Sequence, residues 1–397
     1  GDLLVAALAE PVGRCCEVPS AILPAVVKAD CIRFRPRPDL NRRFIMYWLN
    51  SPTGRRNAEQ HSHGVGRLRI NMAAIRELPV PVPPRDVQDQ IVATIETHFS
   101  RLDATVASLT RAKANVKRAR ASVLKAAVEG RLVPTEAALA RAEGRDYEPA
   151  SVLLEQILAE RKAAWAASGA RGKYKEPVKP ETEGLPELPV GWVWATLEQL
   201  GEGARPFAYG VLVPGPDVPD GVPFVRVGDI GEGSVADRPE KSIARTVADK
   251  FKRTYLQGGE LLLSIVGTIG RVGVASAHLK GANVARAVGV LPLVERISSQ
   301  FVVFAIRSHA TQHRLVGAAH EVARKTLNME DVRATVVPVP PLAEQYRIVA
   351  EVDRRFSVLD ALNATLDANL ARCARLRQSV LKRAFEGRLV PADTAEG

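Results

Sequence analysis

Hydrophobic residues recur every seven positions in two long segments of the chain. They are Ile95, Leu102, Leu109, Val116 and Val123 in the first segment, and Val352, Leu359, Leu366, Cys373 and Val380 in the second. A heptad seam of five positions predicts a long helix that packs against a partner helix. Paired prolines precede each segment and a glycine, Gly130 or Gly387, follows it, which marks the predicted helix ends. A helix over residues 85–127 would be about 65 Å long at 1.5 Å per residue.

A second, partial seam differs between the two segments. It holds Ile91, Ala112, Ala119 and Ala126 in the first, and Ile348, Leu362 and Leu376 in the second. Small residues in one helix that face large residues in the other would suit mutual packing. We therefore expect the two helices to pack against each other. Two unrelated surface helices, or a coiled coil between two copies of the chain, are the alternatives.

Both segments belong to an internal repeat with an offset of 257 residues. The sequence PVPP at 81–84 returns at 338–341, and EGRLVP at 129–134 returns at 386–391. Between these ends the copies align without a gap, for example SVLK at 122–125 with 379–382. Self-similarity at a fixed spacing indicates a duplicated structural unit.

The pattern of hydrophobic and polar positions differs outside the two predicted long helices. Residues 150–166 are amphipathic and predict a short helix, and the charged Gly/Pro stretch 169–184 predicts an exposed linker. Short runs rich in β-branched residues at 222–227, 260–266 and 288–294 are separated by Gly and Pro. With a helix at 299–316, they predict a mostly β domain over 186–337, so the fold class is α+β.

The first eighty residues align with only the second half of that domain. Residues 1–6 resemble 259–264, and the pattern H-x-V-x-R-x-x-x-N at 63–71 returns at 320–328. We therefore expect residues 1–80 to be the back half of a domain whose front half is absent. Cropping of the sequence, a misassigned start codon and natural shortening are three possible causes.

The charge balance favours a polyanionic partner. The 397 residues include 55 Lys and Arg against 44 Asp and Glu, which gives a net charge of +11. DNA, RNA, the ribosome and acidic lipid all fit this charge. The four cysteines form no C-x-x-C pair, and no apolar run of about 18 residues or leader-like segment is visible. We therefore expect reduced thiols, a cytoplasmic location and no membrane association.

Several motifs resemble those of one known family. PVPPLAEQ at 338–345 opens the second long helix, EGRLVP closes both helices, LPVGW at 188–192 opens the β-rich domain, and GTIG at 267–270 follows a predicted strand. Together these residues resemble the specificity subunit of Type I restriction–modification systems, the HsdS family. The resemblance covers essentially the whole chain. The first copy departs from it at residues 85–87, where RDV stands in place of LAE.

The resemblance implies two target recognition domains joined by two antiparallel helices. On that basis residues 1–80 are the C-terminal half of the first recognition domain and 81–134 the central helix. Residues 135–185 are a short helix and linker, 186–337 the second recognition domain and 338–397 the distal helix. The implied partners are double-stranded DNA with a split target, two methyltransferase subunits (HsdM), and ATP-driven restriction subunits (HsdR) that join the complex. The helix pair should then set the length of the spacer within the target.

Polar residues in or beside loops are the candidate DNA contacts, because Lys and Arg bind phosphates and polar side chains read base edges. In the first domain they are Arg14, Arg55, Arg56, His61, His63, Arg67 and Arg69. In the second they are Arg205, Tyr209, Arg226, Lys241, Lys252, Arg253, Thr268, Arg271, Asn283, Arg286, Arg324 and Lys325. For any one of them, a solvated surface charge is the simpler interpretation. His61 and His63 alone lack the further ligands that a zinc site requires.

No catalytic motif accompanies these residues. Methyl transfer to a base amine needs an Asn/Asp-Pro-Pro-aromatic motif, which neither Pro-Pro pair provides, and no P-loop motif for ATP is present. The glycines at 267, 270 and 273 fit a β-turn better than a nucleotide-binding loop. We therefore expect a non-catalytic DNA-binding subunit without cofactor or metal. The rival hypotheses are a coiled-coil scaffold that binds proteins, and a truncated fragment that dimerises to rebuild a full reader.

Overall fold

The computed structural model describes residues 1–8, 11–28, 30–64, 67–167, 173–321 and 325–389. The chain divides into two compact units. Unit 1 comprises residues 1–116 and 361–397, and unit 2 comprises residues 117–360. Each long helix contributes one part to each unit. Among the described residues, none of the helices combines the length and the apolar character that spanning a membrane requires.

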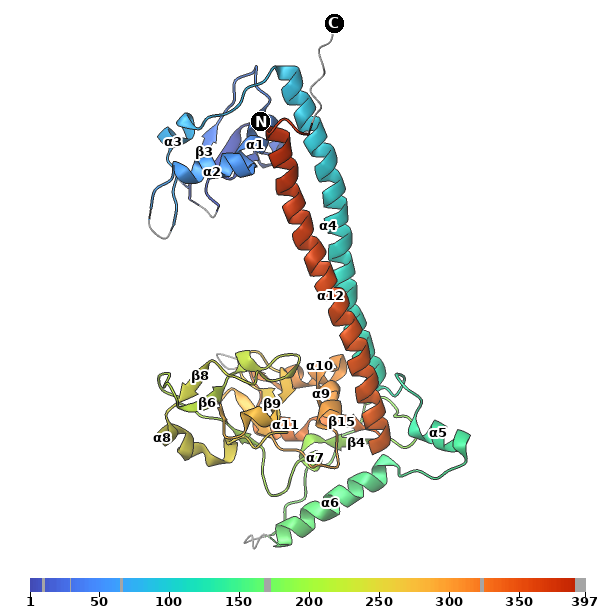
Figure 1. Cartoon of the computed structure of the whole chain (residues 1–397). Helices are drawn as coiled ribbons and strands as arrows, with labels where there is room; N and C mark the ends of the chain where they lie inside the picture. The colour runs from blue at the N-terminus through green and yellow to red at the C-terminus, as the bar shows by residue number, and fades with distance from the viewer. Residues whose placement is uncertain (9–10, 29, 65–66, 168–172, 322–324, 390–397) are drawn as a thin grey trace. The chain divides into compact units, whose positions relative to one another are not determined.

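The two predicted long helices are α4 (Arg85–Val128) and α12 (Leu342–Phe385), which lie side by side (Figure 1). In unit 1, Asp103 of α4 pairs with Arg377 of α12, and Lys113 pairs with Asp367 at 2.5 Å. A step forward along α4 is thus a step back along α12, so the helices are antiparallel. Both the helices and their mutual packing are confirmed.

The heptad seam forms the contact between the helices. Ile95, Val116, Leu366 and Cys373 are buried in unit 1, and Val123 and Val352 in unit 2. The other four seam residues, Leu102, Leu109, Leu359 and Val380, are half-buried. The prediction that Leu362 and Leu376 belong to a second buried seam is wrong, because these side chains are 46% and 42% exposed. A pair of helices buries one stripe on each member, and these leucines lie beside that stripe.

Unit 2 contains the mostly β domain. Its largest sheet has five strands in the order β5 (Ala208–Tyr209), β12 (Val288–Leu291), β9 (Leu261–Ser264), β10 (Val272–Val274) and β7 (Gly233–Ser234). A second sheet has the order β11 (Asn283–Val284), β6 (Val222–Val225) and β8 (Lys241–Ile243). Two further pairs are β13 (His320–Glu321) with β14 (Lys325–Thr326), and β15 (Val336–Val339) with β4 (Val193–Thr196). The predicted strands at 222–227, 260–266 and 288–294 are confirmed as β6, β9 and β12, each shorter than the run that predicts it.

Unit 2 also contains shorter helices. They are α5 (Glu136–Glu143), α6 (Ala150–Ala167), α7 (Leu197–Leu200), α8 (Arg245–Ala248), α9 (Ser299–Arg307), α10 (His309–Ala318) and α11 (Met329–Ala334), with the 3-10 turns η2 (Val227–Asp229), η3 (Asp249–Thr254) and η4 (Ala277–Leu279). The prediction of one helix over 299–316 is wrong, because α9 ends and α10 begins at Ser308. The Ser308 hydroxyl donates to the Ala305 carbonyl and accepts from the Thr311 amide, so one side chain caps both helices.

Unit 1 repeats part of this domain. Its sheet has the order β2 (Cys15–Glu17), β1 (Leu3–Ala6) and β3 (Cys31–Phe34), which reproduces the strands β10, β9 and β12 of unit 2. The helices α1 (Arg42–Asn50), α2 (Pro52–Gln60) and α3 (Met72–Glu77) correspond to α9, α10 and α11, and the 3-10 turn η1 (Ser20–Ile22) precedes β3. Ser51 caps α1 and α2 as Ser308 caps their counterparts. The duplication therefore extends from sequence to local hydrogen bonding.

Candidate nucleic-acid interface

A buried glutamine fastens the β-sheet-containing part of each unit to a long helix. In unit 1, Gln88 accepts a hydrogen bond from the Asn41 amide at 2.8 Å and donates one to the Pro83 carbonyl at 2.8 Å. In unit 2, Gln345 accepts from the Ser298 amide at 2.9 Å and donates to the Pro340 carbonyl at 2.9 Å. Each glutamine thus links the first turn of α4 or α12 to the start of α1 or α9.

A second anchor uses an arginine that crosses from one long helix to the other. In unit 1 the Arg377 guanidinium lies 4.6 Å from the centre of the Phe99 ring and pairs with Asp103. In unit 2 the Arg120 guanidinium lies 4.8 Å from the Phe356 ring and pairs with Asp360. A domain ring meets each phenylalanine edge-on, Tyr47 at 5.6 Å and Phe304 at 6.1 Å.

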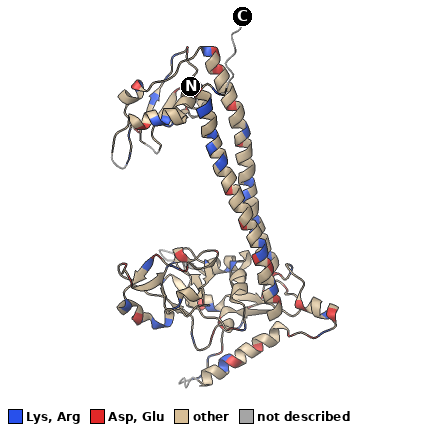
Figure 2. Cartoon of the chain, viewed as in Figure 1, with Lys and Arg blue, Asp and Glu red and all other residues tan. Residues whose placement is uncertain are grey.

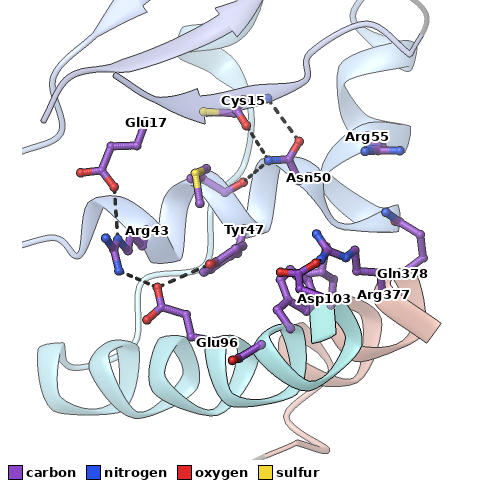
Figure 3. A pocket seen from close by; sticks show the side chains of 14 residues that line it. Cys15, Glu17, Arg43, Tyr47, Asn50, Arg55, Glu96, Asp103, Arg377 and Gln378 are labelled. Carbon is purple, nitrogen blue, oxygen red and sulfur yellow. Dashed lines mark hydrogen bonds and ion pairs between the residues drawn. The ribbon is translucent and has the colours of Figure 1, made fainter. Parts of the chain in front are cut away.

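The anchor of unit 1 borders a cavity of about 760 Å³ (Figure 3). Its charges are largely paired. Arg43 contacts Glu17 at 3.1 Å and Glu96 at 2.8 Å, and these hydrogen bonds raise the pKa of Arg43. The Tyr47 hydroxyl donates to Glu96 at 3.4 Å, and burial raises its pKa. Burial also raises the pKa of the Cys15 thiol to about 12, so that thiol stays protonated at neutral pH and is not an activated nucleophile.

Unit 2 carries a groove of about 960 Å³ with a basic rim. The 3-10 turn η3 supplies Lys250, Lys252 and Arg253, whose exposed side chains form no ion pair or hydrogen bond with the described residues. Tyr209 also lines the groove, 44% exposed, and its hydroxyl accepts a 2.6 Å hydrogen bond from the Met329 amide. A fixed ring beside unpaired cations is an arrangement that can contact a nucleic acid.

The remaining candidates of unit 2 divide into two groups. Thr268, Arg271 and Arg286 are exposed and, within the described part of the chain, their side chains have no polar partner. Thr268 lies in the turn between the antiparallel strands β9 and β10, as expected for a β-turn. These side chains stay candidates for DNA contact.

The second group is already engaged within the domain. Arg205 pairs with Glu260 at 2.6 Å, Arg226 with Glu240 at 3.1 Å, and the Lys241 ammonium donates to the Gly215 carbonyl at 2.8 Å. Asn283 is fully buried and bonds to the Thr254 hydroxyl at 2.7 Å. It cannot reach a ligand in this conformation, so its predicted DNA contact has no structural support and we assign it a structural role.

In unit 1 most candidates are exposed. Arg14, Arg56, His63 and Arg67 lack polar side-chain partners among the described residues. The His61 ring nitrogen lies 2.8 Å from the Asn57 carbonyl, and Arg69 lies 4.0 Å from Asp30. Arg55 is half-buried with an unpaired Nε, and burial lowers its pKa. Within the described residues, no group of three or more His, Cys, Asp or Glu side chains could hold a metal ion.

Described residues that flank the shared H-x-V-x-R pattern pair in both units. His63 and Arg69 form an antiparallel bridge in unit 1, and His320 pairs with Thr326 at the equivalent positions of unit 2. Lys325 is exposed in β14. Arg324 lies outside the described residues. The backbone pairing of these positions is thus common to the two units.

Sequence reasoning missed two basic residues of the unit 2 groove, Lys250 and Arg333. Lys250 belongs to the run KFKR at 250–253, whose cluster of like charge was the available signal. Arg333 follows an acidic helix start, and its partner Glu198, at 3.8 Å, is distant in sequence. No feature of the neighbouring sequence therefore marked Arg333 as a groove residue. Lys and Arg also recur along both long helices (Figure 2).

The chain is similar to known proteins over most of its length. The family described as the Type I restriction modification DNA specificity domain matches residues 13–115 and 199–372. The specificity subunit of the Type I restriction enzyme EcoBI from Escherichia coli is 30% identical over 375 residues, covering 94% of this chain and 71% of the relative. The EcoKI specificity subunit from Escherichia coli strain K12 is 23% identical, covering 93% and 70%.

A solved structure shares the fold. It comes from work on complex assembly and conformational transition of the type I R-M system. The similarity has a TM-score of 0.63 at 18% identity and covers 98% of this chain and 82% of the other.

Proposed function

The chain belongs to the Type I restriction modification DNA specificity domain family, and we propose that it reads a split DNA target with two short specific parts and an unspecific spacer. As a specificity subunit it recognises DNA sequence. The finer proposal rests on the duplication. The glutamine anchor and the arginine anchor occur once in each unit, at equivalent positions.

Two recognition domains attached in the same way to one antiparallel helix pair suit two separated segments of a duplex, as half-sites do in dimeric binders. The spacer length is then set by the helix pair. We assign phosphate contacts to the unpaired cations of unit 2, above all Lys252 and Arg253, and also to Lys250, Arg271 and Arg286. In unit 1 we assign phosphate contacts to Arg14, Arg56 and Arg67.

The partners follow from the same proposal. Because the two units repeat the same structure, they offer two equivalent docking surfaces, which suit two methyltransferase subunits. Restriction subunits join through that complex. Methylation and cleavage are carried by those partners, so this chain is a non-catalytic subunit that acts in the cytoplasm.

The double substitution Lys252→Ala and Arg253→Ala tests the phosphate contacts. The measurement is duplex DNA binding by the chain assembled with its methyltransferase partner, at several salt concentrations. The logarithm of affinity falls with the logarithm of salt concentration by about one unit of slope per phosphate contact. We expect the slope to become shallower by about two.

Lys179→Ala is the matched control, because Lys179 is an exposed lysine of unit 2 outside the groove. It should leave the slope and the affinity unchanged. If the double variant behaves like this control, Lys252 and Arg253 do not contact the DNA backbone.

A further inference from the structure

The loop between β5 and β6 of unit 2, residues 210–221, exposes two adjacent apolar side chains. Leu212 is 55% exposed and Val213 is 72% exposed, whereas Val211 before them is 1% exposed. Single exposed apolar side chains are common on protein surfaces. Two adjacent ones, called the apolar tip below, form a small surface that a partner can cover.

Hydrogen bonds fix the N-terminal side of the apolar tip. The Val211 amide donates to the Val284 carbonyl at 2.7 Å, and the Val211 carbonyl accepts from the Arg286 amide at 2.9 Å. Gly210 lies so close to the same segment that a Cβ atom there would be 2.1 Å from the Val284 carbonyl oxygen. The backbone is therefore packed directly against β11 and the residues after it, up to the start of the tip.

Contacts with β8 fix the other side of the tip. The Lys241 ammonium donates to the Gly215 carbonyl at 2.8 Å, and the Asp217 carboxylate accepts from the Ser242 amide at 2.8 Å. Pro214 follows the tip directly, and its ring restricts the backbone further. Because only residues 212–214 separate the anchored positions 211 and 215, a ligand would meet a preorganised surface.

An unpaired cation and the basic groove adjoin the tip. The side chain of Arg286, whose amide bonds to Val211, is exposed and has no polar partner within the described residues. Tyr209, which lines the groove, precedes Leu212 by three residues. A polyanion that binds these cations would therefore meet the tip. The tip has no side-chain hydrogen-bonding group, so it can contact DNA only at apolar parts of the bases.

We propose that Leu212 and Val213 form an apolar base-reading element that contributes to the sequence specificity of unit 2. The inference rests on the proposed function, because it needs a DNA duplex bound to this domain. The tip contacts the apolar surface of a base, which is either a thymine methyl group or the face of a partly unstacked base. Phosphates carry no sequence information directly, whereas such a contact depends on the base. The tip thus adds discrimination and leaves the salt dependence of binding unchanged.

The experiment uses the full chain assembled with its methyltransferase partner. One duplex carries the motif that sequencing of methylated bases defines, and a second duplex of equal length carries that motif scrambled. We expect Leu212→Ser and Val213→Ser each to weaken binding to the motif duplex about tenfold, because the buried apolar contact is lost. Binding to the scrambled duplex and the salt slope should stay unchanged. Both side chains are exposed, so the variants should fold.

Val190→Ser is the matched control, since Val190 is 68% exposed in unit 2 and lies outside the groove. It should leave binding to both duplexes unchanged. The proposal is overturned if the tip variants bind the motif duplex like this control, or if they lose affinity equally for the two duplexes. A wild-type complex that does not prefer the motif duplex would instead refute the proposed function, so the two failures are distinguishable.

Two modified duplexes identify the part of the base that the tip contacts. Uracil in place of each thymine in turn removes one methyl group, and 2-aminopurine placed along the motif brightens when its neighbours unstack. For a methyl contact, one uracil position should weaken wild-type binding and leave the Leu212→Ser complex unaffected. For a contact with a base face, 2-aminopurine should brighten with the wild type and not with Leu212→Ser. Either result supports the proposal, and the absence of both overturns it.

Discussion

Replacing Gln345 with methionine should release the start of α9 from the start of α12. Gln345 is fully buried, and its side chain makes both hydrogen bonds that join the Ser298 amide and the Pro340 carbonyl to the helix. Methionine preserves the volume of the side chain and removes both bonds. Each buried polar group left without a partner costs about 1–3 kcal/mol, so the lower limits alone give about 2 kcal/mol and the middle values about 4 kcal/mol.

Hydrogen exchange measured by mass spectrometry is the direct assay, because the Ser298 amide loses its acceptor. A loss of about 3 kcal/mol in local opening free energy corresponds to exchange roughly 100-fold faster, since about 1.4 kcal/mol is a factor of ten. Gln88→Met should produce the same effect at the Asn41 amide of unit 1. Gln60→Met, on the exposed end of α2, is the control. Unchanged protection of Ser298 in the Gln345→Met protein would refute the anchoring role.

Two further predictions concern the long helices. Leu366→Ala should lower the free energy of unfolding by about 2–4 kcal/mol and Leu362→Ala by less than about 1 kcal/mol, because Leu366 is 7% exposed and Leu362 is 46% exposed; equal shifts in the denaturant midpoint would contradict the observed seam. Hydrogen bonds from Arg354 and Arg355 lower the pKa of Glu351 to about 2, so its contribution to stability is present above about pH 4.5 and is lost as the pH falls towards 2. Arg354→Ala should raise that pKa in a carbon-13 NMR titration, and an unchanged midpoint would show that the pair does not form in solution.

The helix pair could be predicted closely because its signals are local and repeated. Seven-residue spacing, bordering prolines and a second copy at a fixed offset all indicated the same element, and α4 begins at Arg85 as predicted. The prediction of a second buried seam failed because residue spacing alone does not indicate how many helices pack around one core. The break at Ser308 was missed because α9 and α10 continue the same apolar pattern, while a single hydroxyl separates them.

The candidate contacts could be predicted only as residue types. Whether an arginine is available depends on partners that are distant in sequence, as with Arg205 and Glu260, or Arg226 and Glu240. Whether a side chain is buried likewise depends on residues that are distant in sequence. Asn283 follows a glycine-containing loop and reads as a surface residue, but it lies in the second sheet with its side chain inside the domain. The basic run of η3 differs, because its side chains are exposed and form no ion pair within the described residues.

Sequencing of the methylated bases in a host that carries this gene and its methyltransferase partner tests the central claim most directly. The account predicts one modified motif with two short specific parts and a gap of constant length. The motif should disappear when this chain is omitted and the methyltransferase is kept. A single uninterrupted motif, or methylation that does not depend on this chain, would contradict the account.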